Sequence, residues 1–317
     1  MRDKNILLAR NKVAVLKVIT IVKIDEKLPF VSVIIPTYHD WERLKLCING
    51  LHEQTYPRDF FEVIIINNDP ADVPPPSLDL MDNCLLITDG TPGSYAARNA
   101  GIRFAKGTIL AFTDSDCIPQ PRWIEAAVTA LSLGADRVAG KVELFFKSGK
   151  LTAVEKYEKA LAFQQDNYVQ IQGSSVTANL ITCKSAFEKV GLFDQSLFSG
   201  GDMEWGWRAR DSGLSIIYSP EAVVLHPARR SIQEILRKKK RIIGGACNIA
   251  RLRENEGRIW FFMGFFPPIG FYIEIFKRND LVFSEKIIVS LLEYLIRLHK
   301  TCYKSLLLLR FRKPIRR

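Results

Sequence analysis

The sequence lacks the marks of several common protein classes. Its six cysteines are scattered and form no CxxC pair, so neither a zinc cluster nor a disulfide framework is predicted, and a reducing, cytosolic setting is expected. No uninterrupted run of about 20 apolar residues occurs, which argues against a clear membrane-spanning helix. The opening MRDKNILLARNK is too densely charged for the apolar core of a signal peptide.

What is present is a globular composition with an uneven charge. The chain has 317 residues, of which 47% are hydrophobic and 25% charged, enough for a large core. Residues 229–317 hold 21 Lys or Arg against 7 Asp or Glu, a net charge of +14, whereas the rest of the chain carries −3. A near-neutral body with a basic tail favours an anionic partner, either lipid headgroups or nucleic acid.

Short β-branched runs alternate with amphipathic stretches along the first third of the chain. Strands are predicted at residues 31–35, 62–66, 84–87 and 108–112, with helices at 41–51 and 95–105. This alternation predicts an α/β fold with a mostly parallel sheet, whose ligands gather at the carboxyl ends of the strands. The polar clusters PTY, NND and TDSD fall at those ends.

Asp114, Ser115 and Asp116 follow a predicted buried strand directly. Two carboxylates at positions i and i+2 in a loop can hold a divalent cation through oxygen ligands, and that cation can bridge a diphosphate. The alternative is a strand-terminating turn in which an Asp caps the next helix, since Pro119 and Pro121 follow.

Two further polar residues occupy comparable positions. Asp202 leaves a glycine loop and enters a helix, where it could act as a general base on an acceptor hydroxyl or simply cap the helix. His226 ends the apolar run AVVL, either as a metal ligand or as a structural histidine. Nearby, Trp205 and Trp207 either stack on sugar rings or are buried.

The segment DGTPGSYAARNAGI (89–102) offers backbone N–H groups and Arg98 to an anionic group. It is neither a Walker loop nor a GxGxxG turn, so as an isolated phosphate signal it is weak.

The order of these segments resembles that of a known family. VSVIIPTYHDWERLKLCINGL, FEVIIINND, PGSYAARNAGI, ILAFTDSDCIP, LFSGGDMEWGWRARDSG and VVLHP follow one another as in the family-2 glycosyltransferases of the GT-A fold. The resemblance covers roughly residues 30–228. Any one block is weak, and the set is specific.

The resemblance implies a role for each block. Pro36, Thr37 and Tyr38 would line a nucleotide pocket, with Asn68 facing the base. Arg98, Asp114 and Ser115 would contact the nucleotide sugar, and Asp116 would coordinate Mg²⁺ or Mn²⁺ with His226 as a further ligand. Asp202 would be the catalytic base. The acceptor or supporting positions would be Glu204, Trp205, Trp207 and Arg208.

Two departures from the family pattern affect this assignment. Asn67-Asn68-Asp69 stands where the family often has Asp-Asp or Asp-Asn, so the base preference is uncertain. Gly201 stands where the family often has Glu before the catalytic Asp. The QxxRW block of processive synthases is also absent, which favours the addition of a single sugar.

Three regions are expected: an N-terminal extension (1–29), a GT-A domain (30–228) and a basic, aromatic-rich helical extension (229–317). Residues 231–317 either pack on the catalytic domain with a solvated basic face or anchor the protein to an anionic membrane surface. The β-branched segment 13–24 is predicted to be an added strand or a docking segment.

The resemblance therefore implies a metal-dependent inverting glycosyltransferase in cell-surface polysaccharide or glycolipid synthesis. It would use a nucleotide-sugar donor (UDP by default, with GDP, dTDP or a lipid phosphate open) and a saccharide or lipid-linked acceptor, as a peripheral protein at the inner face of the cell membrane. The rivals are a catalytically degenerate homologue and a nucleic-acid-binding protein, although no nucleic-acid-binding signature accompanies the basic tail. A nucleotidyltransferase would carry a glycine-rich basic loop after the first strand, where PTYHDWERL has none.

Overall fold

The computed structural model describes residues 28–252 and 262–308. The predicted N-terminal segment 13–24 lies outside these residues, as do the start of the aromatic stretch at 259–261 and the end of the basic tail.

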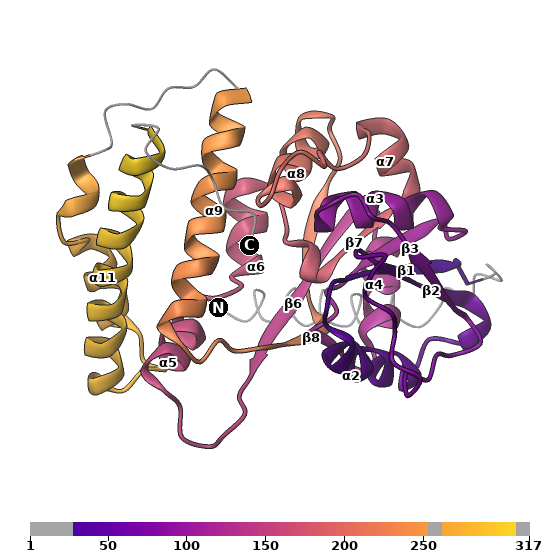
Figure 1. The fold of residues 1–317 in the computed structure, drawn as a ribbon, viewed down its shortest axis with the longest axis horizontal. Helices are drawn as coiled ribbons and strands as arrows, with labels where there is room; N and C mark the ends of the chain where they lie inside the picture. The colour runs from indigo at the N-terminus through magenta and orange to yellow at the C-terminus, as the bar shows by residue number, and fades with distance from the viewer. Residues whose placement is uncertain (1–27, 253–261, 309–317) are drawn as a thin grey trace, which may run out of the picture.

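A single mixed sheet forms the centre of the described part of the chain, in the order β3-β2-β1-β4-β7-β6-β8-β5 (Figure 1). In chain order the strands are β1 (Val31–Thr37), β2 (Phe61–Asn67), β3 (Cys84–Thr88), β4 (Ile109–Phe112), β5 (Ile118–Pro119), β6 (Arg137–Phe145), β7 (Leu180–Cys183) and β8 (Ile216–Pro227). Four pairings are parallel, and the three that involve β5 or β7 are antiparallel. The predicted α/β fold with a mostly parallel sheet is confirmed.

Helices cover both faces of this sheet (Figure 1). Because side chains alternate along a strand, Val33 and Ile35 of β1 join one core cluster and Ile34 joins another. The first cluster packs against α2 (Trp41–His52) and α4 (Trp123–Ser132). The second packs against α3 (Ser94–Phe104), α7 (Lys184–Val190) and α8 (Gly201–Asp211). The short helices are η1 (Arg58–Phe60), α6 (Gln165–Asn167), η2 (Tyr168–Gln172), η3 (Thr177–Asn179) and η4 (Phe262–Phe265).

The basic C-terminal extension is helical, as predicted, and stands beside the sheet (Figure 1). It comprises α9 (Ile232–Leu252), α10 (Ile269–Lys277) and α11 (Phe283–Leu308), which pack with α5 (Ala153–Leu161) around a third apolar cluster. This cluster includes Tyr157, Ile235 and Val289. In the described ranges, no helix combines the length and apolar character needed to cross a membrane.

The start of α9 is fixed to the rest of the protein through buried ion pairs. Glu158 on α5 is 3% exposed and pairs with Arg229 at 3.0 Å and with Lys238 at 3.9 Å. Burial lowers the pKa of Lys238 to about 7. Since a buried charge is costly unless it is paired, these contacts hold α9 in register against α5.

Further along α9, the helix backbone closely approaches the loop that precedes α8. A Cβ added at Gly245 would lie 2.1 Å from the carbonyl oxygen of Ser199, so only glycine fits there. Gly200, with a φ of 81°, lies next to Ile249 in the same contact. The C-terminal extension therefore packs directly against the loop that leads into α8.

Arg137 on β6 braces α8 from the opposite side. Its guanidinium is buried and donates to three carbonyl oxygens: Gly173 and Gly206 at 3.2 Å and Leu214 at 2.8 Å. These acceptors lie within and just after α8 and in the loop that contacts it, so a single cation ties β6 to the helix.

We expect replacement of Arg137 by methionine to lower the free energy of unfolding by about 3 kcal/mol, because one buried and two part-buried carbonyl groups lose their donor. Urea unfolding followed by circular dichroism measures the loss. Arg122→Met is the matched control, since Arg122 is largely exposed and, among the residues that the structure describes, pairs only with Glu125. Equal stability of the two variants would contradict the bracing role.

Candidate active site

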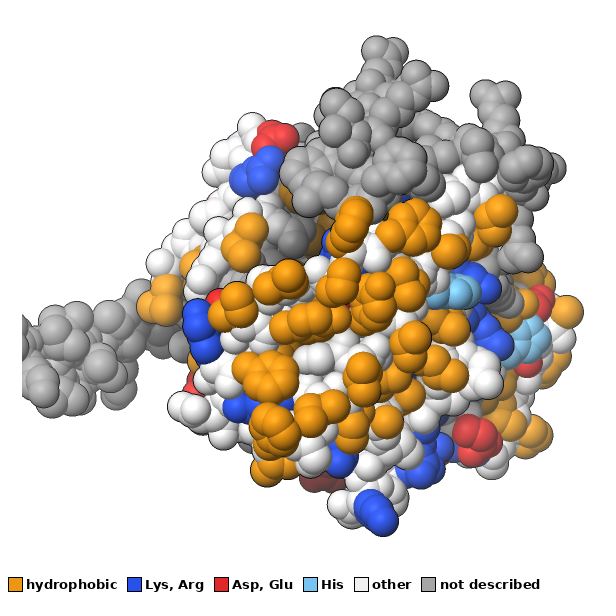
Figure 2. All heavy atoms as spheres, turned by 90° about the vertical axis from the view of Figure 1, so that its left-hand side faces the viewer, with side chains coloured by type: hydrophobic (Ala, Val, Ile, Leu, Met, Phe, Trp, Pro, Cys, Tyr) orange, Lys and Arg blue, Asp and Glu red, His pale blue; other side chains and the backbone are white. Residues whose placement is uncertain are grey.

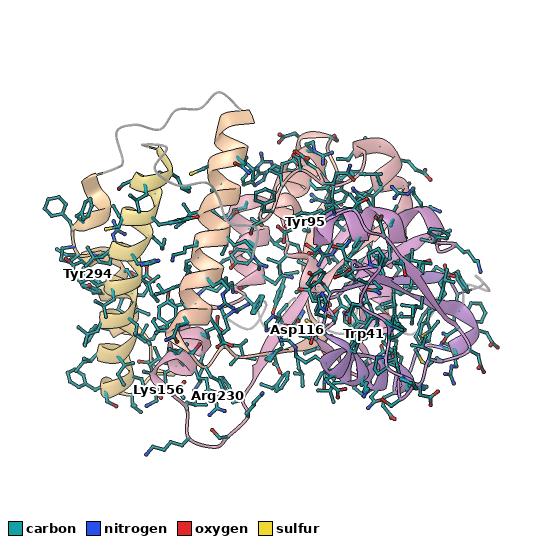
Figure 3. The ribbon with its side chains drawn as sticks, viewed as in Figure 1. Trp41, Tyr95, Asp116, Lys156, Arg230 and Tyr294 are labelled. Carbon is teal, nitrogen blue, oxygen red and sulfur yellow. The ribbon has the colours of Figure 1, made fainter. Side chains whose placement is uncertain are left out.

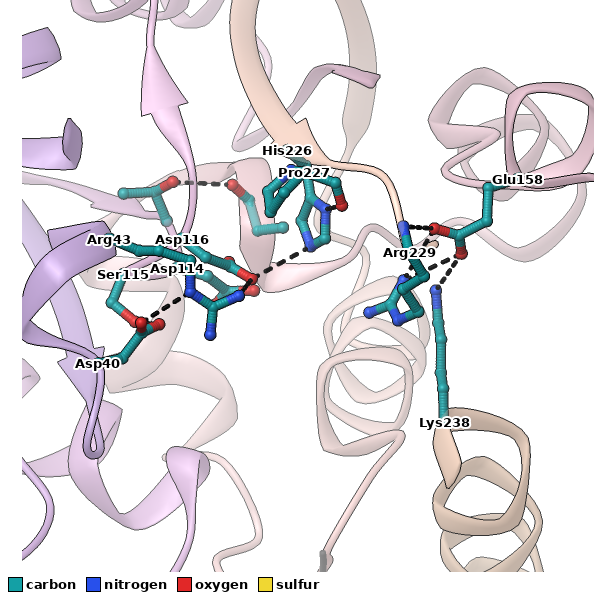
Figure 4. A network of polar contacts seen from close by, with 12 residues as sticks. Asp40, Arg43, Asp114, Ser115, Asp116, Glu158, His226, Pro227, Arg229 and Lys238 are labelled. Carbon is teal, nitrogen blue, oxygen red and sulfur yellow. Dashed lines mark hydrogen bonds and ion pairs between the residues drawn. The ribbon is translucent and has the colours of Figure 1, made fainter. Parts of the chain in front are cut away.

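The carboxylates that follow β4 meet His226 of β8 at one end of the sheet (Figure 4). The Oδ2 atom of Asp116 lies 3.8 Å from Nε2 of His226, which is 5% exposed. These residues are 110 positions apart in the sequence and come together because β5 pairs with β8 beside them.

The hydrogen bonding of the His226 ring leaves Nε2 without a proton. Nδ1 lies 2.8 Å from the carbonyl oxygen of Pro227, and because a carbonyl only accepts, Nδ1 carries the hydrogen. Burial lowers the pKa of His226, which favours the neutral ring. Its Nε2 lone pair therefore faces the Asp116 carboxylate. A cation placed between Nε2 and the carboxylate could be bound by both acceptors.

Arg43 and Asp40 also belong to this cluster, although no sequence motif singled them out. Arg43 Nη1 lies 3.2 Å from Asp116 Oδ2, and its Nε lies 2.7 Å from Asp40. The Ser115 hydroxyl donates to Asp40 at 3.2 Å. Burial raises the pKa of Asp40. The α2 side chains thus surround the Asp114–Asp116 turn and supply a cation to it.

Cys117 completes a group with Asp114 and Asp116 whose potential ligand atoms lie within 4.8 Å of one another. We do not assign Cys117 as a ligand, because a metal binds the thiolate and burial raises the pKa of this thiol well above its usual value. Carboxylate oxygens are the ligands that Mg²⁺ and Mn²⁺ prefer, so Asp114 and Asp116 are the better candidates, with Nε2 of His226 lying 3.8 Å from Asp116.

Arg98 lies between the two acidic parts of the site. It is 3% exposed, forms a close ion pair with Asp114, and its charge also acts on Asp202. Its Nε atom is buried and has no hydrogen-bond partner among the residues described. A buried cation with one donor to spare suits an anionic ligand.

Asp202 lies in the first turn of α8 and is held by three donors. Its Oδ1 accepts from the Tyr95 hydroxyl at 3.1 Å and from the Met203 amide at 3.0 Å, and its Oδ2 accepts from the Thr177 amide at 3.3 Å. Burial raises the pKa of Asp202, although Arg98 and the hydrogen bonds act in the opposite direction. A carboxylate with a raised pKa is a stronger base.

Tyr95 explains why glycine precedes this aspartate. A Cβ added at Gly201 would lie 2.8–3.0 Å from the Tyr95 ring, so any larger residue would displace it. Gly201 therefore admits the side chain that orients Asp202. Figure 3 shows Tyr95 and Asp116 along the boundary between the sheet and the C-terminal helices.

We expect Tyr95→Phe to reduce the rate about tenfold and to move the acid limb of the rate profile to higher pH. Loss of the hydroxyl removes a hydrogen bond that lowers the pKa of Asp202, so the base becomes protonated at a higher pH. The base must be ionised to act, and the rate therefore falls earlier as pH decreases. Profiles of kcat/KM against pH for the native chain and the variant measure the shift; superimposable profiles would contradict it.

The residues expected to line a nucleotide pocket differ in burial and in their hydrogen-bond partners. Pro36 and Thr37 are buried at the end of β1, and Thr37 Oγ1 has no hydrogen-bond partner within the described ranges, whereas Tyr38 is exposed. The expectation for Asn68 is corrected. Its Nδ2 donates to the carbonyls of Asp89 and Thr91, and its Oδ1 accepts from Gly93. Asn68 therefore holds the 89–93 loop instead of facing the base.

Among the expected acceptor or supporting residues on α8, the structure selects the buried alternative for Trp205 and gives Glu204 and Arg208 partners within the fold. Trp205 is fully buried and stacks on Phe187 at 4.4 Å, so it is not available to a sugar ring. Arg208 donates to Glu204 and to the carbonyls of Val190 and Leu192. The Glu204–Arg208 pair is thus a structural clamp. Trp207 is half-buried and retains the acceptor-side expectation.

Comparison with known proteins gives a consistent result. Residues 32–190 match the family model described as glycosyl transferase family 2. The chain is 36% identical over 258 residues to glycosyltransferase AglE of Haloferax volcanii, covering 78% of this chain and 84% of that protein.

Two more distant similarities extend over most of the chain. It is 22% identical to a dolichyl N-acetyl-alpha-D-glucosaminyl phosphate 3-beta-D-2,3-diacetamido-2,3-dideoxy-beta-D-glucuronosyltransferase of Methanococcus voltae, covering 89% of this chain and 92% of that one. Among solved structures, the mannosyltransferase PcManGT of Pyrobaculum calidifontis, in complex with GDP-Man and Mn²⁺, has a TM-score of 0.49 at 14% identity. That match covers 90% of this chain and 75% of that chain.

Proposed function

This chain belongs to glycosyl transferase family 2, and from that premise we propose that it transfers one sugar from a nucleotide-sugar donor to an acceptor hydroxyl, with inversion at the anomeric carbon. The observation that carries the proposal is the convergence of Asp114, Arg98 and Asp202 at one end of the sheet, where Arg98 pairs with Asp114 and its charge also acts on Asp202. UDP is the default nucleotide, with GDP and dTDP open.

Asp114, Asp116 and His226 are the residues that would hold Mg²⁺ or Mn²⁺. The fit rests on the Nε2 lone pair of His226, which faces the Asp116 carboxylate with no proton between them. A bound divalent cation would neutralise charge on the departing nucleoside diphosphate. Arg43 already lies 3.2 Å from Asp116 and would share in balancing that charge.

Asp202 is proposed as the base that removes the proton from the acceptor hydroxyl. Tyr95 and the Thr177 amide orient its two oxygens, and its raised pKa favours proton capture. Arg98 contributes a fixed positive charge between this base and the Asp114 side of the site, where a diphosphate would lie. With a single carboxylate at the attacking side, one displacement without a covalent intermediate is the simplest reaction.

The acceptor is proposed to be a saccharide or a lipid-linked hydroxyl in cell-surface polysaccharide or glycolipid synthesis, with the protein at the inner face of the cell membrane. The dolichyl-phosphate sugar in the name of the Methanococcus voltae relative supports a lipid-linked acceptor. The excess of basic residues in the extension supports an anionic surface nearby.

The test is a donor screen with the purified full chain. UDP-, GDP- and dTDP-sugars are supplied with Mn²⁺ or Mg²⁺ and saccharide or lipid-linked acceptors, and release of nucleoside diphosphate is followed. We expect one donor to turn over only with metal, with the anomeric configuration of the product opposite to that of the donor. Donor binding without turnover would instead support a catalytically degenerate homologue, and absence of donor binding would exclude both readings.

A further inference from the structure

Helix α11 has two apolar faces. One is buried against neighbouring helices, and the other is exposed. Val289, Ile296, Tyr303 and Leu307 are buried against α5, α9 and α10. A second row, spaced four residues apart on the other side of the helix, is exposed and consists of Phe283, Ile287, Leu291 and Leu295. A surface helix with an ordinary solvent face would carry polar side chains in that row.

The exposed row continues onto α10 and the turn before it. Phe266 and Ile269 are each 67% exposed, and Ile273 and Phe276 are exposed beside them. Figure 2 shows these apolar side chains gathered across one face of the molecule, with Lys and Arg side chains around its margin and fewer acidic ones. We call this surface, formed by the exposed side chains of residues 265–295, the α10–α11 face. A contiguous apolar surface of this kind marks an interaction site.

The chemistry of the α10–α11 face favours a lipid surface as its partner. Its exposed side chains are mainly Phe, Ile and Leu, which gain by entering the boundary between headgroups and acyl chains. The described part of the extension, 232–252 and 262–308, holds 12 Lys or Arg against 5 Asp or Glu. Lys286 lies next to the apolar row, where its Nζ donates to the carbonyl of Phe276, whereas Lys277 is paired with Glu274. Each basic residue near an anionic leaflet adds to binding.

We propose that the α10–α11 face docks on an anionic lipid bilayer, with its Phe, Ile and Leu side chains inserted at the headgroup level and the Lys and Arg side chains on lipid phosphates. The inference rests on the membrane placement proposed above, which it deepens by naming the surface. The sheet and α8 lie on the other side of α9 (Figure 1), so docking leaves the candidate active site uncovered.

The test uses the full chain and vesicles made of equal parts phosphatidylcholine and phosphatidylglycerol. Ile287 and Leu291 are both replaced by serine, and the matched control replaces Leu133 and Ile171, which are 80% and 78% exposed on the catalytic domain. We expect native chain and control to sediment with the vesicles, and the Ile287→Ser/Leu291→Ser variant to bind at least about tenfold more weakly. All three should melt at the same temperature.

Three results would overturn the proposal: no sedimentation of the native chain, equal binding by both double variants, or a native dimer that the Ile287→Ser/Leu291→Ser variant turns into a monomer. The last result would assign the face to a second copy of the chain. Donor turnover is measured on the same samples with a water-soluble acceptor. If the Ile287→Ser/Leu291→Ser variant keeps its turnover but loses vesicle binding, the docking face and sugar transfer are independent. Absence of turnover in the native chain would contradict only the proposed sugar transfer.

Discussion

Asp202→Asn is expected to lower kcat about 1,000-fold or more while leaving donor binding nearly unchanged, because general-base assistance is worth about 100- to 10,000-fold. Asparagine keeps the size of the side chain, and its one oxygen can still accept from the Tyr95 hydroxyl and the Met203 amide, so the local fold should persist. The bond from the Thr177 amide is lost, because the NH2 group of asparagine only donates. Turnover is measured as nucleoside-diphosphate release under saturating donor and acceptor.

Asp211→Asn provides the control for this substitution. Asp211 ends the same helix, is exposed, and within the described part of the chain its side chain bonds only to the neighbouring Arg210. It should retain full activity. If Asp202→Asn kept more than a tenth of the native rate, another group would have to remove the proton, and the role assigned to α8 would fail.

Asp116→Ala should weaken Mn²⁺ binding and reduce turnover, each by at least about 100-fold, since it removes the carboxylate that faces His226. Electron paramagnetic resonance of free Mn²⁺ measures binding without any need for activity. Asp166→Ala, at an exposed position on α6, is the control and should bind Mn²⁺ as the native chain does. Unchanged Mn²⁺ binding by Asp116→Ala would place the cation elsewhere.

The sheet, and the polar residues at the carboxyl ends of its strands, were predictable because a chain of alternating strands and helices has few possible topologies. Asp114–Asp116 and His226 ended apolar runs, and parallel strands bring such ends to the same edge. Strand boundaries were less predictable. Strand β8 begins at Ile216, before the apolar run that marked it, because pairing with β6 extends it.

Three expected site residues have partners inside the fold for one physical reason. Trp205, Arg208 and Asn68 are of types that bind sugars, phosphates and bases, but residue type does not reveal which way a side chain points. Each found a partner within the fold: Phe187 for Trp205, the carbonyls of Val190 and Leu192 for Arg208, and the 89–93 loop for Asn68. Tyr95 and Arg43 were missed for the converse reason, because their partners Asp202 and Asp116 are 107 and 73 residues away.

The close contact between Gly245 and Ser199 has a consequence for how this protein can be divided. The loop Ser199–Gly200 leads directly into the first turn of α8, which carries Asp202. The backbone of α9 packs against this loop. A chain truncated after the sheet would lose the packing of α9 against this loop, and an unrelated C-terminal fusion would not restore it. We therefore expect removal of the extension to disturb the loop that precedes Asp202.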